Sequence, residues 1–105
     1  MSLSILTRVY NTILARKSAE PTSSYVASLF AKGSKKIAQK VGEEATETVL
    51  ASAGGNKKEI ISESADLLFH LLVLWAAHDV TPDEVANELK RREGTSGIEE
   101  KKSRG

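Results

Sequence analysis

Apolar residues recur at helical spacing along most of this chain. Leu6, Val9, Tyr10, Ile13 and Leu14 follow the i, i+3, i+4, i+7 pattern of an amphipathic helix. Similar segments, separated by Gly, Pro and polar residues, predict helices over residues 3–17, 24–32, 34–53, 57–79 and 82–92. No stretch shows the alternation typical of a β-strand. The pattern therefore predicts an all-α fold, a bundle of four to five helices.

Several helix ends carry their own signals. Gly33 is expected to end the second helix, and Ser34 to cap the third. Asn56, three residues before Glu59, predicts an N-cap for the fourth helix. The segment Thr81-Pro82-Asp83-Glu84 combines a capping residue, a proline at the first helical position and a glutamate at the third. Of these helix ends, the start of the last helix therefore has the strongest signal.

The helix predicted at residues 57–79 is apolar on almost every side. Its large apolar residues include Ile60, Leu67, Leu68, Phe69, Leu71, Leu72, Val73, Leu74 and Trp75. A helix of this kind must be covered all round, and the other short helices cover it poorly. We therefore expect a homodimer with this helix at the interface; the alternative is that Phe69 and Trp75 are ordinary core residues. The apolar run at 67–77 contains His70 and is too short to span a bilayer.

Four carboxylates form two pairs around the Gly54-Gly55 break. Glu44 and Glu47 lie three residues apart, as do Glu63 and Asp66, and this spacing puts each pair on one helix face. At about 100° per residue, Glu44 lies within the apolar stripe of its helix and Glu47 at its edge. Glu43 points further out. Two such helices packed side by side would bring the four carboxylates together.

Carboxylates on a core-facing surface are costly unless they are paired, protonated or bound to a cation. Two like charges about 4 Å apart repel by about 4 kcal/mol at an effective dielectric near 20. Oxygen ligands favour Mg²⁺, with Mn²⁺ as the alternative. We therefore predict a metal site made by Glu44, Glu47, Glu63 and Asp66. A solvated acidic face is the usual explanation of a single Glu-x-x-Glu, and a di-iron bundle would need a Glu-x-x-His signature that is absent.

Lysines precede the acidic residues. A helix N-terminus is expected at Gly33 and Ser34, where it offers free N–H groups to an anion. The lysines near it are Lys32 before it and Lys36 and Lys40 after it. Together with the carboxylates, they predict a phosphate chain bridged to the metal. A solvated, basic helix start is the alternative.

Length, charge and cysteine content limit the possible domain organisation and function. The 105 residues suggest one domain, residues 1–93, followed by a flexible polar tail at 94–105. The net charge of +1 gives no general attraction to nucleic acid or to a membrane. With no cysteine, the chain has no disulfide, thiolate zinc site or cysteine nucleophile. The start lacks a signal-peptide pattern, so a cytoplasmic protein is expected.

Three segments resemble phosphoribosyl-ATP pyrophosphohydrolase, one of the all-α nucleotide pyrophosphohydrolases that also include MazG-like enzymes and dimeric dUTPases. The segments are residues 24–30 (SYVASLF), 36–47 (KIAQKVGEEATE) and 63–72 (ESADLLFHLL). The Glu-x-x-Glu and Glu-x-x-Asp pattern of that group matches Glu44, Glu47, Glu63 and Asp66 one for one. The resemblance covers about residues 3–92.

This resemblance implies a magnesium-dependent hydrolysis of 1-(5-phospho-β-D-ribosyl)-ATP to phosphoribosyl-AMP and pyrophosphate, the second step of L-histidine biosynthesis. Glu44 and Glu47 are the expected catalytic residues, with Glu47 accepting the proton of the attacking water. Lys32, Lys36 and Lys40 are the expected substrate-binding residues. In similar proteins the activity is often fused to a cyclohydrolase domain that binds zinc through cysteines. Because this chain has none, a separate phosphoribosyl-AMP cyclohydrolase is expected to act next.

Other functions stay open at this point. A related pyrophosphohydrolase acting on dUTP or non-standard nucleotides would keep the four carboxylates and change the base pocket. A non-enzymatic helical dimerisation module would tolerate their neutralisation. His70, one turn beyond Asp66, either orients a carboxylate or is a satisfied core histidine.

Overall fold

The structure is a computed structural model that describes residues 4–94, 97–98 and 101. The described residues contain helices and no strand, which confirms the predicted all-α fold. The described ends of the helices fall within two residues of the predicted ones. The predicted tail at 94–105 lies largely outside the described residues. The helices are α1 (Ser4–Arg16), α2 (Tyr25–Lys32), α3 (Ser34–Gly54), α4 (Lys57–Ala77) and α5 (Pro82–Arg91).

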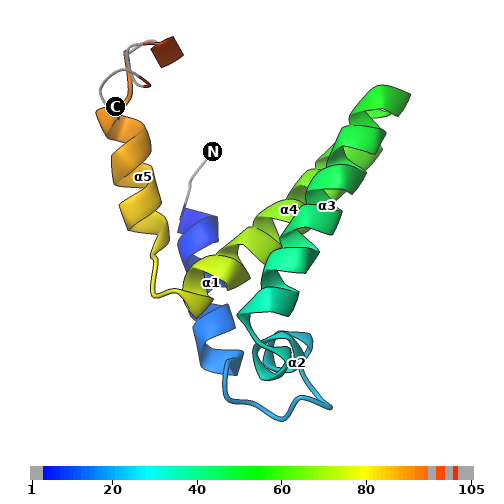
Figure 1. Cartoon of the computed structure of the whole chain (residues 1–105), viewed down its shortest axis with the longest axis vertical. Helices are drawn as coiled ribbons and strands as arrows, with labels where there is room; N and C mark the ends of the chain where they lie inside the picture. The colour runs from blue at the N-terminus through cyan, green and yellow to red at the C-terminus, as the bar shows by residue number, and fades with distance from the viewer. Residues whose placement is uncertain (1–3, 95–96, 99–100, 102–105) are drawn as a thin grey trace.

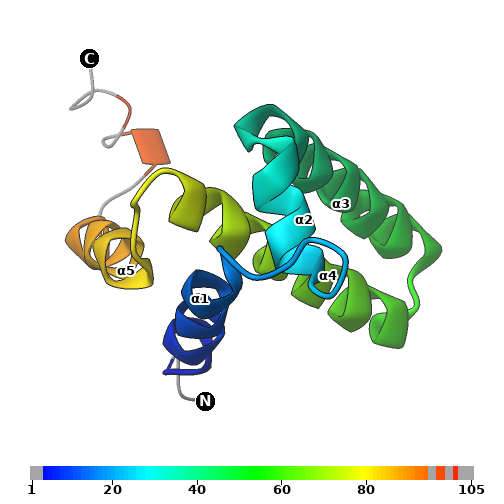
Figure 2. The same ribbon diagram turned by 90° about the horizontal axis from the view of Figure 1, so that it is seen from below.

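The helices form an open V (Figure 1). α3 and α4 run antiparallel along one arm, whereas α5 lies on the other arm beyond α1. Seen from below, α2 lies across the base of the V, in front of the α3–α4 pair (Figure 2). The α3–α4 hairpin therefore projects from a base that α1 and α2 complete.

A single glycine joins α2 to α3. Gly33 has φ +97°, in the region that favours glycine, and its N–H bonds to the carbonyls of Leu29 and Phe30 at the end of α2. The same glycine occupies the N-cap position of α3, with no side-chain cap. The prediction that Ser34 caps this helix is therefore wrong, because Ser34 is already the first residue of α3. The junction is too short to hold a separate capping residue.

The other predicted caps are confirmed. The Asn56 side chain accepts the N–H of Glu59 at 3.1 Å and starts α4. Thr81 and Glu84 form a reciprocal capping box at the start of α5, with contacts of 3.2 and 2.9 Å. Gly55, with φ +74°, closes α3 in the left-handed conformation. Gly55 and Asn56 therefore fix where α3 ends and where α4 begins.

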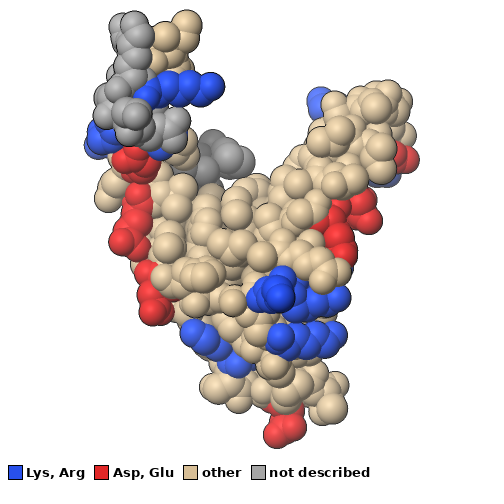
Figure 3. Space-filling model, viewed as in Figure 1, with Lys and Arg blue, Asp and Glu red and all other residues tan. Residues whose placement is uncertain are grey.

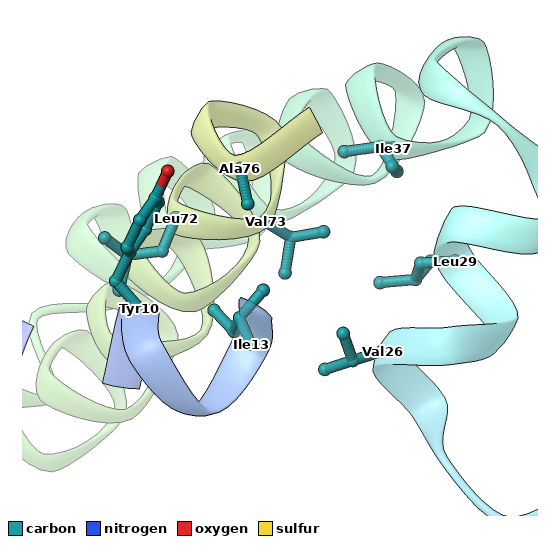
Figure 4. Packing of buried hydrophobic residues seen from close by; sticks show 8 residues of the cluster. All are labelled: Tyr10, Ile13, Val26, Leu29, Ile37, Leu72, Val73 and Ala76. Carbon is teal, nitrogen blue, oxygen red and sulfur yellow. The ribbon is translucent and has the colours of Figure 1, made fainter. Parts of the chain in front are cut away.

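The core lies at the base of the V. Val26 and Leu29 of α2 point toward Ile13 of α1 and Val73 of α4 (Figure 4). The buried cluster comprises Tyr10, Ile13, Val26, Leu29, Ile37, Leu72, Val73 and Ala76. Each large aliphatic side chain buried here contributes roughly 1.5–3 kcal/mol. This packing anchors the C-terminal half of α4.

Apolar side chains remain exposed away from this core. Val49, Leu50 and Ile61, near the tip of the hairpin, are 67%, 64% and 60% exposed. On the other arm Leu89 is 66% exposed, and Leu68 of α4 is 42% exposed. One copy of the chain therefore leaves part of α4 uncovered. The sequence had predicted that the other helices would cover this helix poorly.

Candidate active site

Three carboxylates converge where the middle of α3 passes the first half of α4. Glu44, Glu63 and Asp66 each offer an oxygen atom, and these atoms lie within 4.8 Å of one another. Glu44 is only 9% exposed, whereas Asp66 is exposed. The cluster is therefore buried at Glu44 and open to solvent at Asp66.

Thr48 sets the register that brings these residues together. Its hydroxyl donates to the carbonyl of Glu44, 2.8 Å away in its own helix, and lies 3.2 Å from the carbonyl of Glu63 in α4. One hydroxyl hydrogen is thus shared between two helices at the level of the carboxylates. At about 100° per residue, Thr48 lies on the same face of α3 as Glu44, and this phase is the sequence signal for the contact.

The converging carboxylates disturb one another. Burial raises the pKa of Glu44, and the charge of Glu47 raises it further. Burial also raises the pKa of Glu63, with Glu47 as the next cause. One oxygen of Glu44 and one of Glu63, both Oε2, are buried without a hydrogen-bond partner in the described part of the chain. Such atoms carry a desolvation cost that protonation or a cation would relieve.

Glu47 lies on the open side of the cluster. It is not one of the three residues within 4.8 Å, yet it is close enough to raise the pKa of both Glu44 and Glu63. Together with Glu63 it lines a hollow of about 340 Å³ that also includes Leu50 and Glu59. The structure thus brings three of the four predicted carboxylates into one group and places the fourth at its rim.

These donors suit a hard divalent cation. All are carboxylate oxygens, two of their buried atoms lack partners, and their like charges repel. Glu44, Glu63 and Asp66 would hold Mg²⁺ directly. Glu47, at the rim, would complete the site from the solvent side.

Glu43 faces away from the group. Its carboxylate accepts from Gln39 at 2.8 Å and from Lys40 at 3.3 Å, and these two bonds lower its pKa in that order. Its side chain is 47% exposed, against 11% for Glu44. The prediction that Glu43 points further out than Glu44 is therefore confirmed.

The predicted lysines differ in their distance from the carboxylates. Lys40 Nζ lies 3.9 Å from Glu44 Oε1, at the edge of the group. Lys36 contributes to lowering the pKa of Glu43, after Gln39 and Lys40. Lys32, at the exposed end of α2, makes no ion pair with the carboxylates within the described residues. Figure 3 shows Lys and Arg side chains gathered on this arm directly below a group of Asp and Glu side chains.

A tyrosine that the sequence did not single out lies beside this site. The Tyr25 hydroxyl is 2.7 Å from His70 Nε2, and His70 Nδ1 is 2.8 Å from the backbone carbonyl of Asp66. His70 is 6% exposed, so it is a buried histidine satisfied through both nitrogens. It bonds to the backbone of Asp66. The i, i+4 spacing of these two α4 residues was the available signal, but Tyr25 comes from another helix.

A comparison with protein families decides the relationship that the motifs suggested. The family model for phosphoribosyl-ATP pyrophosphohydrolase matches residues 6–93. The chain belongs to the phosphoribosyl-ATP pyrophosphohydrolase family. It is 60% identical over 100 residues to a phosphoribosyl-ATP pyrophosphatase of Geobacter sulfurreducens, covering 95% of this chain and 93% of that protein. A phosphoribosyl-ATP pyrophosphatase of Azospirillum brasilense is 55% identical over 104 residues, covering 99% and 94%.

Membership of the phosphoribosyl-ATP pyrophosphohydrolase family makes the chain a hydrolase and confirms the predicted resemblance. It also bears on α4, which by length and composition is apolar enough to cross a membrane. Core helices of soluble proteins pass the same test, and α4 carries Glu63 and Asp66 against α3. One such helix is weak evidence for a membrane span, and it does not make this chain a membrane protein.

Proposed function

We propose that this chain hydrolyses 1-(5-phospho-β-D-ribosyl)-ATP to phosphoribosyl-AMP and pyrophosphate, the second step of L-histidine biosynthesis, and that it requires Mg²⁺. The observation that carries the metal requirement is the group of Glu44, Glu63 and Asp66, with two buried oxygens lacking partners. The substrate follows from relatives that are 55–60% identical over nearly the whole chain.

The carboxylates have different roles, which follow from their positions. When bound, Mg²⁺ supplies charge neutralisation for the triphosphate and polarisation for attack at the α–β linkage. Glu44 and Glu63 direct their unpaired buried oxygens into the group, and Asp66 closes it from the exposed side. Glu47 faces the open hollow, where a carboxylate accepts the proton of the attacking water.

The lysines bind the phosphate chain. Lys40 lies at the edge of the carboxylate group, and Lys36 is one turn earlier on α3. Lys32 marks the far end of the same basic surface, next to the start of α3. A triphosphate bound at the carboxylates would lie beside Lys40 and extend toward Lys36.

We further propose that the enzyme works as a homodimer in the cytoplasm, with a separate phosphoribosyl-AMP cyclohydrolase taking its product. A hollow of about 290 Å³ lies between α1, α4 and α5. Its lining is apolar throughout: Leu6, Leu68, Leu71, Trp75, Pro82, Val85, Ala86 and Leu89. A second copy of α4 and α5 laid against this surface would cover the apolar residues that one chain leaves exposed.

The direct experiment measures the products released from phosphoribosyl-ATP with Mg²⁺ and with EDTA. We expect pyrophosphate and phosphoribosyl-AMP in equal amounts, only with Mg²⁺. Glu47→Gln is the matched variant and should lose most of the activity, because it removes the carboxylate that accepts the proton of the water. Orthophosphate as the first product would overturn the reaction class, and faster turnover of dUTP would favour the related nucleotide hydrolase.

A further inference from the structure

We propose that the ring of Tyr25 stacks against the adenine of the substrate, so that this residue contributes to recognition of the base. This inference rests on the proposed function, because the substrate determines where a base would lie. It adds a base-binding contact to a site otherwise made of four carboxylates and three lysines.

Tyr25 differs from the other aromatic residues of the chain in its exposure. All five of them, two tyrosines, two phenylalanines and one tryptophan, lie within the described ranges. Tyr25 is 51% exposed, whereas the other four are buried or half-buried. Among the aromatic side chains, its ring is therefore the one with a large surface free to contact a bound ligand.

Two hydrogen bonds place this ring beside the carboxylate group. The Tyr25 hydroxyl lies 2.7 Å from His70 Nε2, and His70 Nδ1 lies 2.8 Å from the backbone carbonyl of Asp66. One imidazole ring thus separates Tyr25 from the backbone of a residue that would hold Mg²⁺. A ligand bound at Asp66 therefore has this exposed ring close by.

The Tyr25 ring is held in a fixed orientation. A backbone carbonyl can only accept, so His70 Nδ1 carries a hydrogen and, in the neutral ring, Nε2 accepts the Tyr25 O–H. The Tyr25 ring also stacks on Phe69, with the centroids 6.4 Å apart and the planes at 24°. It meets the His70 ring edge-on, with the centroids 5.6 Å apart. Little conformational entropy is therefore left to lose when a flat ligand binds against the open part of the ring.

The chemistry of the substrate favours stacking as the means of binding its base. Hydrolysis at the α–β linkage puts the α-phosphate at the carboxylates, and the nucleoside is bonded to that phosphate. In 1-(5-phospho-β-D-ribosyl)-ATP a second sugar is bonded to N1 of the adenine, so it blocks the edge through which adenine pairs with other bases. The two faces of the purine stay free, and an aromatic side chain binds such a face whatever the edge carries.

The first test compares Tyr25→Leu, which removes the aromatic face, with Tyr25→Phe, which keeps it. Because stacking holds the base in the bound substrate and in the transition state alike, KM for phosphoribosyl-ATP should rise about tenfold in Tyr25→Leu, with kcat within about twofold. Tyr25→Phe should keep KM within about threefold of wild type, since it loses only the hydroxyl. An unchanged KM in Tyr25→Leu, or an equal rise in both variants, would overturn the proposal.

Ile61→Ala is the matched control, since Ile61 is 60% exposed and is rotated about 160° from Glu63 on α4. Its KM should match wild type, and the same tenfold rise there would contradict a specific role of Tyr25. Light scattering of Tyr25→Leu should give the wild-type mass. A changed mass would assign Tyr25 to a contact between copies of the chain and overturn the stacking.

The second test asks whether Tyr25 contacts the base rather than the phosphates. Inorganic tripolyphosphate carries the phosphate chain without a base, and it serves as a competitor of phosphoribosyl-ATP. Its inhibition constant should be the same in wild type and in Tyr25→Leu, whereas that of the product phosphoribosyl-AMP should rise about tenfold in the variant. An equal rise for tripolyphosphate would refute the contact with the base.

The third test does not depend on hydrolysis. The fluorescent analogue etheno-ATP also carries a substituent on N1 of the adenine, and stacking against an aromatic side chain quenches its emission. Titration in Mg²⁺ should give quenching and similar dissociation constants for wild type, Tyr25→Phe and Ile61→Ala, and weaker binding with less quenching for Tyr25→Leu. The same dissociation constant in Tyr25→Leu would overturn the stacking, even if wild type hydrolyses phosphoribosyl-ATP. Binding that depends on Tyr25, in a protein that does not hydrolyse phosphoribosyl-ATP, would support the stacking and overturn the proposed function.

Discussion

The hydroxyl of Thr48 in α3 lies 3.2 Å from the backbone carbonyl of Glu63 in α4. The same hydroxyl donates to the carbonyl of Glu44 at 2.8 Å, so it joins the two helices at the residues whose side chains form the carboxylate group. This one side chain therefore links the register of the hairpin to the geometry of the site.

Replacing Thr48 with Val keeps the shape and removes the hydroxyl. We expect the free energy of unfolding to fall by about 1 kcal/mol, which is a drop of about 4–8 °C in melting temperature for a domain of this size. Thr46→Val is the matched control, since the Thr46 hydroxyl bonds only within α3, to Gly42 at 3.1 Å, and is exposed. Equal melting temperatures for the two variants would show that the contact between helices adds nothing.

The metal-free protein should become more stable as the pH falls from neutral. The pKa values of Glu44 and Glu63 are raised above their ordinary value of 4.5, so the folded state binds protons more readily than the unfolded chain. The stability that their charges remove at neutral pH returns as the pH falls through the folded pKa values towards 4.5. Urea unfolding in EDTA between pH 7.5 and 5 measures this gain. Glu44→Gln should reduce it, and an identical pH dependence in that variant would be incompatible with the raised pKa.

Glu88 provides a contrast of opposite sign. Hydrogen bonds from Arg91 and Arg92 lower its pKa to about 2. Its contribution to stability is therefore present above 4.5 and lost as the pH falls towards 2. Because this window lies below that of the raised carboxylates, Glu88→Gln should leave the gain between pH 7.5 and 5 unchanged.

The dimer should depend on the apolar surface of α4 and α5. Light scattering is expected to give about twice the chain mass of 11.3 kDa. Leu89→Glu, at a residue that is 66% exposed, should give a monomer that keeps its helical circular dichroism. Ala15→Glu is the control, because Ala15 lies about 180° from Leu6 on α1 and so faces away from the groove. A wild-type monomer at micromolar concentration would remove the dimer.

Local signals in the sequence predicted the helices well. The Thr81–Glu84 capping box and the Asn56 cap are encoded within four residues, so periodicity and capping rules located both helix starts. The prediction of the cap at the start of α3 failed because Gly33 is both the C-cap of α2 and the N-cap of α3. A rule that treats each helix separately assigns that cap to Ser34.

The site was predictable only as far as it follows from helix phase. The phase placed Glu44 inward and Glu43 outward, and the structure agrees. The Thr48 contact depends on the register of two helices, and the Tyr25 contact joins residues 45 positions apart. Neither register nor long-range packing is contained in the periodicity of a single helix.

The central claim is that Glu44 belongs to a magnesium site and its neighbour Glu43 does not. The most direct measurement is the melting temperature of wild type, Glu44→Gln and Glu43→Gln, each in EDTA and in Mg²⁺. In EDTA, Glu44→Gln should melt higher than wild type, because it removes like-charge repulsion of order 1 kcal/mol or more. Mg²⁺ at about 100 times its Kd would stabilise a protein with an intact site by about 2.7 kcal/mol.

We therefore expect Mg²⁺ to raise the melting temperature of wild type and of Glu43→Gln, and to leave that of Glu44→Gln nearly unchanged. The account is contradicted if Glu43→Gln abolishes the Mg²⁺-induced shift while Glu44→Gln retains it.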